Sequence, residues 1–172
     1  MIGLAKDTVQ VVPWQPCWAD SFLQEATRLH SALGSAIGQI EHVGSTSIPG
    51  MIAKPIIDML AAVGRLSLAD ALIPALERLG YEYRPDNPIP GRVFFALGPR
   101  TNRTHHLSLA EIGSDFWQEH IAFRDYLLAN RGAAEEYAAL KQRLAGQFAH
   151  DRPSYTVAKK EFISRILGSR AA

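Results

Sequence analysis

From residue 41 to residue 58 the chain reads EHVGSTSIPGMIAKPIID. Residues 40–43 alternate between apolar and polar side chains and end at Gly44, as a strand does where it enters a tight turn. Residues 55–63 are almost continuously apolar, and Asp58 is the one carboxylate among them. Such a run is typical of a central, buried strand. The stretch therefore predicts two strands joined by a loop rich in glycine and hydroxyl residues.

The elements outside this stretch follow from the spacing of apolar residues and from Gly, Pro and Asn at the breaks. We expect a helix through 22–33, strands at 40–43 and 55–63, a helix at 68–79, three strands in an antiparallel meander at 81–84, 92–97 and 103–110, and helices through 114–127, 137–148 and 151–166. Pro74 either kinks the 68–79 helix or delays its start. This order predicts an α+β fold, with a mixed β-sheet, helices on one face and a C-terminal helical layer.

Composition narrows the class of protein. At 172 residues, with 47% hydrophobic and 20% charged residues, the chain fits one globular domain over residues 1–172. A formal net charge of +1 gives no global field for nucleic acid, so we expect no nucleic-acid partner. No apolar run approaches the roughly 20 residues that span a bilayer, and we see no secretory signal. We therefore expect a cytoplasmic protein without a membrane partner.

Cys17 is the single cysteine, which excludes an internal disulfide and a zinc site built from several cysteines. It lies between Trp14 and Trp18. We expect it to be a small, buried apolar residue.

The loop after the first strand has the chemistry of a phosphate site. Backbone N–H groups and hydroxyls at the end of a strand bind anions, and a following helical turn adds its positive end. The same residues also make ordinary turns. The candidate phosphate-binding residues are Gly44, Ser45, Thr46 and Ser47.

Asp58 is the anomaly in the apolar strand, because an unpaired buried charge costs several kcal/mol. One interpretation is structural: the carboxylate pairs with Lys54, Arg92 or a backbone cap. The other is functional: Asp58 binds a divalent metal ion beside a triphosphate.

Several motifs along nearly the whole chain resemble the GrpB family. The most specific are Gly-Ser-Thr-Ser-Ile-Pro-Gly at 44–50 and Lys-Pro-Ile-Ile-Asp at 54–58, followed by the segments 103–107, 123–127, 137–141 and 155–162. The resemblance implies a nucleotidyltransferase-like fold, since the family is classed in that superfamily. Related domains are fused to dephospho-coenzyme A kinase, for which a folding-accessory role is the usual suggestion.

The resemblance also implies roles for particular residues. Gly44 and Ser45 match the phosphate-binding turn of the superfamily, and Asp58 matches its first metal-binding carboxylate, which would hold Mg²⁺ or Mn²⁺. The chain departs from the pattern at Leu60, where active members carry a second carboxylate. A histidine, His106, stands on the strand where the third is expected. The carboxylate set is therefore incomplete.

The roles of three histidines, His42, His105 and His106, have alternatives. His106 either binds phosphate or acts as a general base, or one of the pair His105 and His106 is a core residue and the other a surface residue. His42 has the same alternatives. Among the cations, Lys54 and Arg103 are the preferred site residues. Lys54 lies in the loop between the strands at 40–43 and 55–63, and Arg103 begins the strand that carries His105 and His106.

Two functions are consistent with these features. The first is binding of a nucleotide or phosphorylated small molecule at Gly44, Ser45 and Asp58, with metal-dependent nucleotidyl transfer left open. The second is a non-catalytic ligand-binding or folding-accessory module that acts on a protein partner. A metalloenzyme centred on histidines ranks below both, because no metal-binding spacing such as His-Glu-x-x-His is present.

Overall fold

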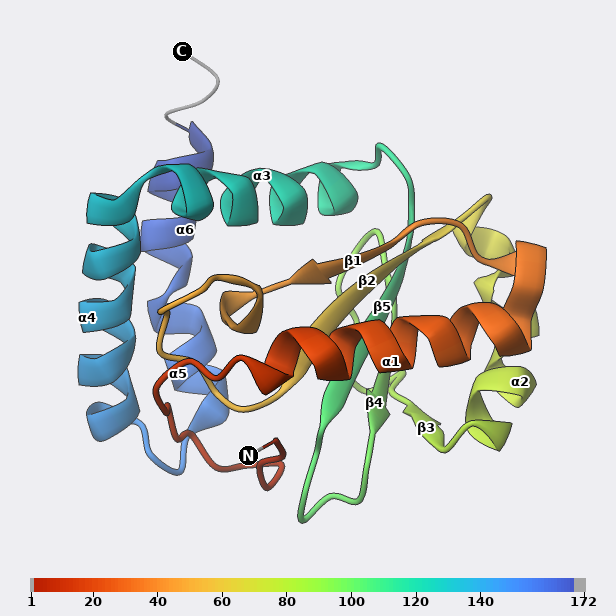
Figure 1. Ribbon diagram of the computed structural model, residues 1–172, viewed down its shortest axis with the longest axis horizontal. Coiled ribbons are helices and arrows are strands. Elements are labelled where there is room, and N and C mark those ends of the chain that lie inside the picture. Colours follow the sequence, from red (N-terminus) through yellow and green to blue (C-terminus); the bar gives the residue numbers. More distant parts are fainter. Residues whose placement is uncertain (1, 169–172) are drawn as a thin grey trace.

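The computed structural model describes residues 2–168. The chain alternates helical and extended segments and ends in consecutive helices (Figure 1). The elements are α1 (Cys17–Leu33), the 3₁₀ turn η1 (Gly34–Ala36), β1 (Ile40–Val43), the 3₁₀ turn η2 (Ser45–Ser47), β2 (Ile57–Val63), the 3₁₀ segment η3 (Leu66–Leu72), α2 (Ile73–Arg78), β3 (Tyr81–Tyr83), β4 (Val93–Leu97), β5 (His105–Glu111), α3 (Asp115–Ala129), α4 (Arg131–Gln147), α5 (Arg152–Ala158) and α6 (Lys160–Gly168).

The strands form one five-stranded mixed sheet in the order β1-β2-β5-β4-β3. The central pair, β2 and β5, is parallel, and the other neighbours are antiparallel. The predicted meander of β3, β4 and β5 and the mixed character of the sheet are both confirmed. A nucleotidyltransferase-like fold goes beyond what this architecture alone establishes.

Helices cover both faces of the sheet, so the expectation of helices on one face is wrong. Met59 and Ala61 of β2 pack in the same core as Trp18 and Leu29 of α1. On the opposite face, Leu60 packs in a second cluster with the first turn of α3. The physical reason lies in the strand itself, because successive side chains of a strand point to opposite faces. Apart from Asp58, those of β2 are apolar on both faces.

The predicted 68–79 helix divides into η3 and α2. Pro74 lies in the first turn of α2, where its missing N–H costs no hydrogen bond. Of the two alternatives for Pro74, the delayed start is the one observed.

Helices α3 and α5 begin at side-chain caps, and the helix predicted over 151–166 contains a break that the sequence pattern did not show. The Ser114 hydroxyl accepts a hydrogen bond from the Trp117 amide at the start of α3. The Asp151 carboxylate accepts one from the Ser154 amide at 3.0 Å. A break at Lys159 divides the last helix into α5 and α6.

The expectation that Cys17 is buried is wrong, because it lies exposed in the first turn of α1.

The C-terminal helices form the expected layer. Figure 1 shows α4, α5 and α6 grouped beside the end of the sheet where β1 ends and β2 begins. This grouping brings side chains from the last third of the chain to the loop of residues 44–54. In the described part of the chain, no helix combines the length and the apolar character needed to cross a bilayer.

Candidate functional site

Asp58 and His106 lie side by side on the two central strands. They are paired in the parallel register of β2 and β5, so their side chains emerge on the same face of the sheet. The His106 Nδ1 atom lies 2.9 Å from the Asp58 Oδ1 atom. The residue that the sequence placed at the third carboxylate position is therefore the direct partner of Asp58.

Arg152 determines the tautomer of His106. Its Nη2 atom lies 3.3 Å from His106 Nε2, and because a guanidinium only donates, Nε2 must accept. The proton of the neutral ring is then on Nδ1, which donates to Asp58. Burial lowers the pKa of His106, although the hydrogen bond and charge of Asp58 oppose this shift. His106 is therefore neutral at neutral pH, with both ring nitrogens occupied.

Asp58 stays ionised. Burial would raise the pKa of its carboxyl group, but the His106 hydrogen bond and the charges of Lys54 and Arg152 outweigh burial and lower the pKa to about 2. The side chain is 45% exposed, because it lies on the floor of a pocket. Among the described residues Oδ1 has a partner and Oδ2 has none, so Oδ2 is free to accept from a ligand.

Gly44 makes room for this carboxylate. Its φ of 72° and ψ of −175° fall in a region that is essentially restricted to glycine. A Cβ atom at this position would lie 2.6 Å from Asp58 Oδ2. The glycine of the predicted phosphate-binding turn is thus required by both backbone conformation and close approach.

The hydroxyls of the turn are divided between structure and pocket. The Ser47 hydroxyl donates to the Gly44 carbonyl at 2.6 Å, and the Thr46 Oγ1 atom lies 2.9 Å from His42 Nε2. Gly44, Ser45 and Thr46 line the pocket. Ser47 is not among the lining residues.

His42 and His105 belong to the opposite face of the sheet. They pair with Met59 and Ile57, respectively, whose side chains lie in the core with α1. His42 stacks on Phe22 with ring centroids 4.8 Å apart, and burial lowers its pKa to about 4. Neither histidine joins Asp58, so the arrangement gives no support to a centre built on the three histidines.

A pocket of about 430 Å³ opens above Asp58 and His106. Its walls come from the sheet face, the turn η2, the loop before β4, and the helices α3 to α6. Two carboxylates, Asp58 and Glu119, line it. They are outnumbered by five cationic side chains, namely Lys54, Arg92, Lys141, Arg152 and Lys159.

The ammonium groups of Lys54 and Lys159 both lie against Tyr155. Their Nζ atoms are 5.3 and 4.4 Å from the centroid of its ring. Burial, followed by the charges of Arg152 and Lys159, lowers the pKa of Lys54 well below its ordinary value. Burial also lowers the pKa of Lys159 to about 8. In the described residues neither ammonium forms an ion pair within 4 Å, so both remain available to a ligand.

Lys141 is more enclosed. It is 2% exposed, donates to the Ile52 carbonyl, and has its Nζ atom 4.9 Å from the centroid of the Tyr137 ring. Burial lowers its pKa to about 7. It lines the pocket and is held by its hydrogen bond to the loop of residues 44–54.

Arg92 and His120 form the other side of the pocket. The Arg92 guanidinium lies 4.0 Å from the Phe94 ring centroid and donates to the Ser108 hydroxyl at 3.2 Å. Burial lowers its pKa to about 10, although the Asp58 charge acts in the opposite direction. His120 Nδ1 lies 2.8 Å from the Phe116 carbonyl, which fixes the proton on Nδ1 and leaves Nε2 as an acceptor.

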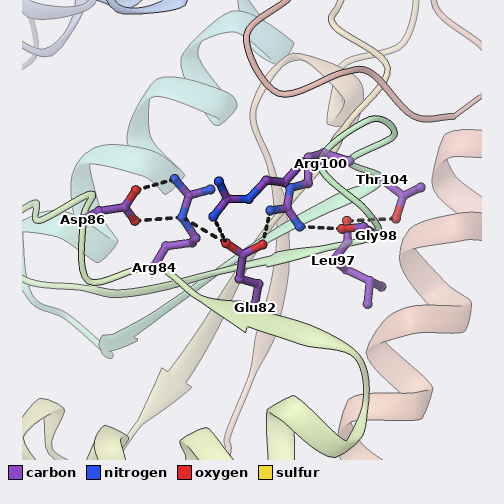
Figure 2. Close-up of polar contacts among 8 residues, drawn as sticks. Glu82, Arg84, Asp86, Leu97, Gly98, Arg100 and Thr104 are labelled. Carbon is purple, nitrogen blue, oxygen red and sulfur yellow. Dashed lines mark hydrogen bonds and ion pairs between the residues drawn. The ribbon is translucent and has the colours of Figure 1, made fainter.

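Arg103 lies elsewhere. Its guanidinium pairs with Glu82 and donates to the Gly98 carbonyl. Figure 2 shows Glu82 between arginines, with Arg84 and Arg100 among its partners. The preferred pair of cations is therefore separated, with Lys54 in the pocket and Arg103 buried in an ion-pair cluster around Glu82.

The lysines of the C-terminal helices were attributed to the solvated surface, and Arg152 was not selected as a site residue. Lys141 follows Tyr137 by four residues and precedes Leu144 by three, so it falls on the apolar stripe of α4 rather than on the solvent side. Arg152, Tyr155 and Lys159 recur at helical spacing on one face. A lysine inside an apolar stripe was the available signal.

The donor set does not fit a two-metal centre. Within residues 2–168, no group of three or more His, Cys, Asp or Glu lies close enough to hold a metal ion. Leu60, two residues after Asp58, is fully buried against α3, and both nitrogens of His106 are occupied. A pocket lined by five lysine and arginine side chains is suited to an anion.

Comparison with known proteins gives consistent matches over most of the chain. The family model described as GrpB protein matches residues 8–169. The glutamate-rich protein GrpB of Alkalihalophilus pseudofirmus is 39% identical over 173 residues, which cover 97% of this chain and 98% of that protein. The UPF0157 protein YqkA of Bacillus subtilis is also 39% identical over 92% of this chain, which spans only 46% of that longer protein.

A solved structure agrees with these matches. The crystal structure of the conserved protein GrpB from Enterococcus faecalis superposes with a TM-score of 0.83 and 37% identity, over 91% of this chain and 94% of that one. A more distant match, at 28% identity, covers 91% of this chain and 44% of a dephospho-CoA kinase of Mycobacterium bovis. The family model and the full-length relative together show that the chain belongs to the GrpB family.

Proposed function

We propose that this chain binds a phosphate-bearing small molecule, a nucleotide or another phosphorylated metabolite, in the pocket above Asp58 and His106. One observation carries the proposal. Five cationic side chains converge on a pocket that holds two carboxylates, although the chain as a whole has a net charge of only +1.

The electrostatics favour an anionic ligand. Besides burial, the charge of Arg152 lowers the pKa values of both Lys54 and Lys159, and the charge of Lys159 also lowers that of Lys54. Like charges therefore repel in a site partly shielded from water. Holding like charges together costs free energy. A phosphate group, with its charge and three acceptor oxygens, offsets that repulsion and forms charge-assisted hydrogen bonds to ammonium and guanidinium groups.

The pocket also has the size and walls of a small-molecule site. Its volume of about 430 Å³ lies within the range of roughly 300–1,000 Å³ for ligand pockets. Phe94, Phe123 and Tyr155 line it, and aromatic rings of this kind pack against flat or apolar parts of a ligand. The cations thus suit the phosphate, and the rings suit the remainder of the molecule.

Nucleotidyl transfer is the reaction that membership of the nucleotidyltransferase superfamily would imply. That reaction uses paired carboxylates to hold metal ions, and β2 offers Asp58 with Leu60 in place of the second carboxylate two residues further on. The proposal is therefore ligand binding by the protein's own cations. Lys54 and Arg152 would neutralise the phosphate charge that a metal ion neutralises in nucleotidyl transfer.

A second candidate function rests on the match to part of a dephospho-CoA kinase. A chain that resembles 44% of that protein is suited to act as a module beside a kinase. In this view it assists the folding of a partner. Refolding of a purified dephospho-CoA kinase would be faster or more complete with this chain than with an equal mass of albumin, and equal recovery would count against the role.

The proposed binding is tested by calorimetric titration with inorganic phosphate, pyrophosphate, AMP and ATP, each in EDTA and again with magnesium. We expect binding in EDTA. Lys159→Met should weaken it roughly 10-fold, the loss of one charge-assisted interaction. Lys160→Met is the matched control, because the neighbouring lysine is exposed and outside the pocket. Absence of binding by all four ligands would contradict the proposal.

Anion affinity should fall as pH rises. A lysine is cationic below its pKa, so Lys141 and Lys159, with pKa values of about 7 and about 8, lose charge as the pH passes through those values. Arg152 stays charged, and Asp58 is ionised throughout. Sulfate, whose charge is constant from about pH 6 to about pH 9, should bind several-fold more weakly at the upper end. A flat profile would show that these ammonium groups do not contact the anion.

A further inference from the structure

We infer that the ligand is a hydroxyl-bearing phosphomonoester, of the class of sugar, polyol or ribonucleoside phosphates, whose phosphate binds Lys54, Arg152 and Lys159 and whose hydroxyl donates to Asp58 Oδ2. This inference rests on the proposed function. It assigns the phosphate to the cationic side of the pocket and the hydroxyl group to Asp58.

The free acceptor is the first step. Asp58 Oδ1 accepts from His106 at 2.9 Å, whereas Oδ2 has no partner among the described residues. Oδ2 lies beside Gly44, where the absence of a side chain keeps the approach open. An ionised carboxylate oxygen is an acceptor only, so a ligand group that meets it must donate a hydrogen bond.

The second step is the direction of the hydrogen bonds that lead to Asp58. Arg152 donates to His106, and His106 donates to Asp58, so the chain of donors ends on the carboxylate. With a pKa of about 2, this carboxylate is a weak base. Its role is to orient a hydroxyl and not to remove the proton.

The third step is the asymmetry of the pocket. Lys54 and Lys159 both lie against the ring of Tyr155 in α5, the helix that begins at Arg152. Arg92 lies instead against Phe94 and donates to Ser108. The charge of Asp58 raises the pKa values of both Lys54 and Arg92. The cations therefore divide into a group of lysines with Arg152 and a single Arg92, and Asp58 lies within reach of both. A phosphate fits the first group, because repulsion between cations is concentrated there.

A phosphate oxygen cannot take the place beside Oδ2, since two anionic acceptors would repel. A ligand that fills the cationic end and also contacts Asp58 must therefore combine a phosphate with a neutral donor. Hydroxyl groups near a phosphomonoester provide that combination. Inorganic phosphate alone binds the cations and leaves Asp58 Oδ2 without a donor.

The test compares two ligands that differ in hydroxyl groups, glycerol 1-phosphate and n-propyl phosphate, by calorimetric titration in EDTA. Wild-type protein should bind glycerol 1-phosphate roughly 10-fold more tightly, the value of a hydrogen bond to a charged acceptor. Asp58→Asn keeps the size of the side chain and an acceptor for His106. It should reduce the preference for glycerol 1-phosphate several-fold and tighten binding of n-propyl phosphate, because a negative charge beside the cations is lost.

The outcomes separate the inference from the function on which it rests. Equal affinity of wild-type protein for the two ligands would overturn the hydroxyl assignment and leave phosphate binding intact. Weaker binding of n-propyl phosphate by Asp58→Asn would overturn it as well. If wild-type protein binds neither ligand, the inference and the proposed function both fail.

Discussion

Gly44→Ala is expected to lower the stability of the protein and to abolish phosphate binding. The backbone conformation at Gly44 is one that other residues adopt at a cost of about 1–3 kcal/mol, and the new Cβ atom would lie 2.6 Å from Asp58 Oδ2. The carboxylate must move, and the cations of the pocket are its nearest attractive partners. An Asp58 side chain paired with them would occupy the place of the anion.

Gly50→Ala is the matched control for this effect. Gly50 lies in the same loop and also has a positive φ, of 80°, but a Cβ atom there meets nothing within 4 Å. Thermal unfolding and phosphate titration of both variants separate backbone strain from the clash with Asp58. Gly50→Ala should lose stability and keep binding. Equal binding by the two variants would show that the contact between Gly44 and Asp58 does not shape the site.

Arg152→Gln is expected to have the largest effect of any substitution among the cations. Phosphate affinity should fall roughly 10- to 100-fold, because one charge-assisted interaction of about 1.5–3 kcal/mol is lost. The pKa of His106 should rise, since the Arg152 charge lowers it and the guanidinium occupies Nε2. Calorimetry measures the first change, and an NMR titration of the histidine ring measures the second.

Arg131→Gln controls for the loss of a charge, because the Arg131 side chain is 92% exposed and lies outside the pocket. Arg152 also donates to the Lys6 carbonyl at 2.9 Å, so the stability of each variant must be measured beside its affinity. An Arg152→Gln protein that is folded, binds phosphate normally and leaves the His106 titration unchanged would contradict the described hydrogen bonds.

Local patterns predicted the sheet well. The apolar run around Asp58 forms the central strand β2, and the strand predicted at 103–110 is observed as β5. The expectation that helices cover one face of the sheet was wrong because both faces of β2 carry apolar side chains. Leu60 and Ala62 alternate with Met59 and Ala61, and this alternation already indicated a second packed face.

The candidate site was predicted in part. Gly44, Ser45, Thr46, Lys54, Asp58 and His106 lie together around one pocket. Arg103 does not, because its partner Glu82 is brought to it by the pairing of strands, which sequence spacing cannot show. Arg152 and Lys159 are separated from Asp58 by about a hundred residues of chain. Only the fold brings them near it, since Arg152 donates to His106 and Lys159 lines the same pocket.

The most direct test of the central claim is to locate a bound anion. Crystals grown in EDTA would be soaked in sodium tungstate, a phosphate mimic with a strong anomalous signal. The account predicts a peak in contact with Lys54, Arg152 and Lys159, above Asp58 and His106, and loss of that peak in Arg152→Gln. Peaks confined to surface lysines, or a pocket that holds an anion only when magnesium is supplied, would contradict it.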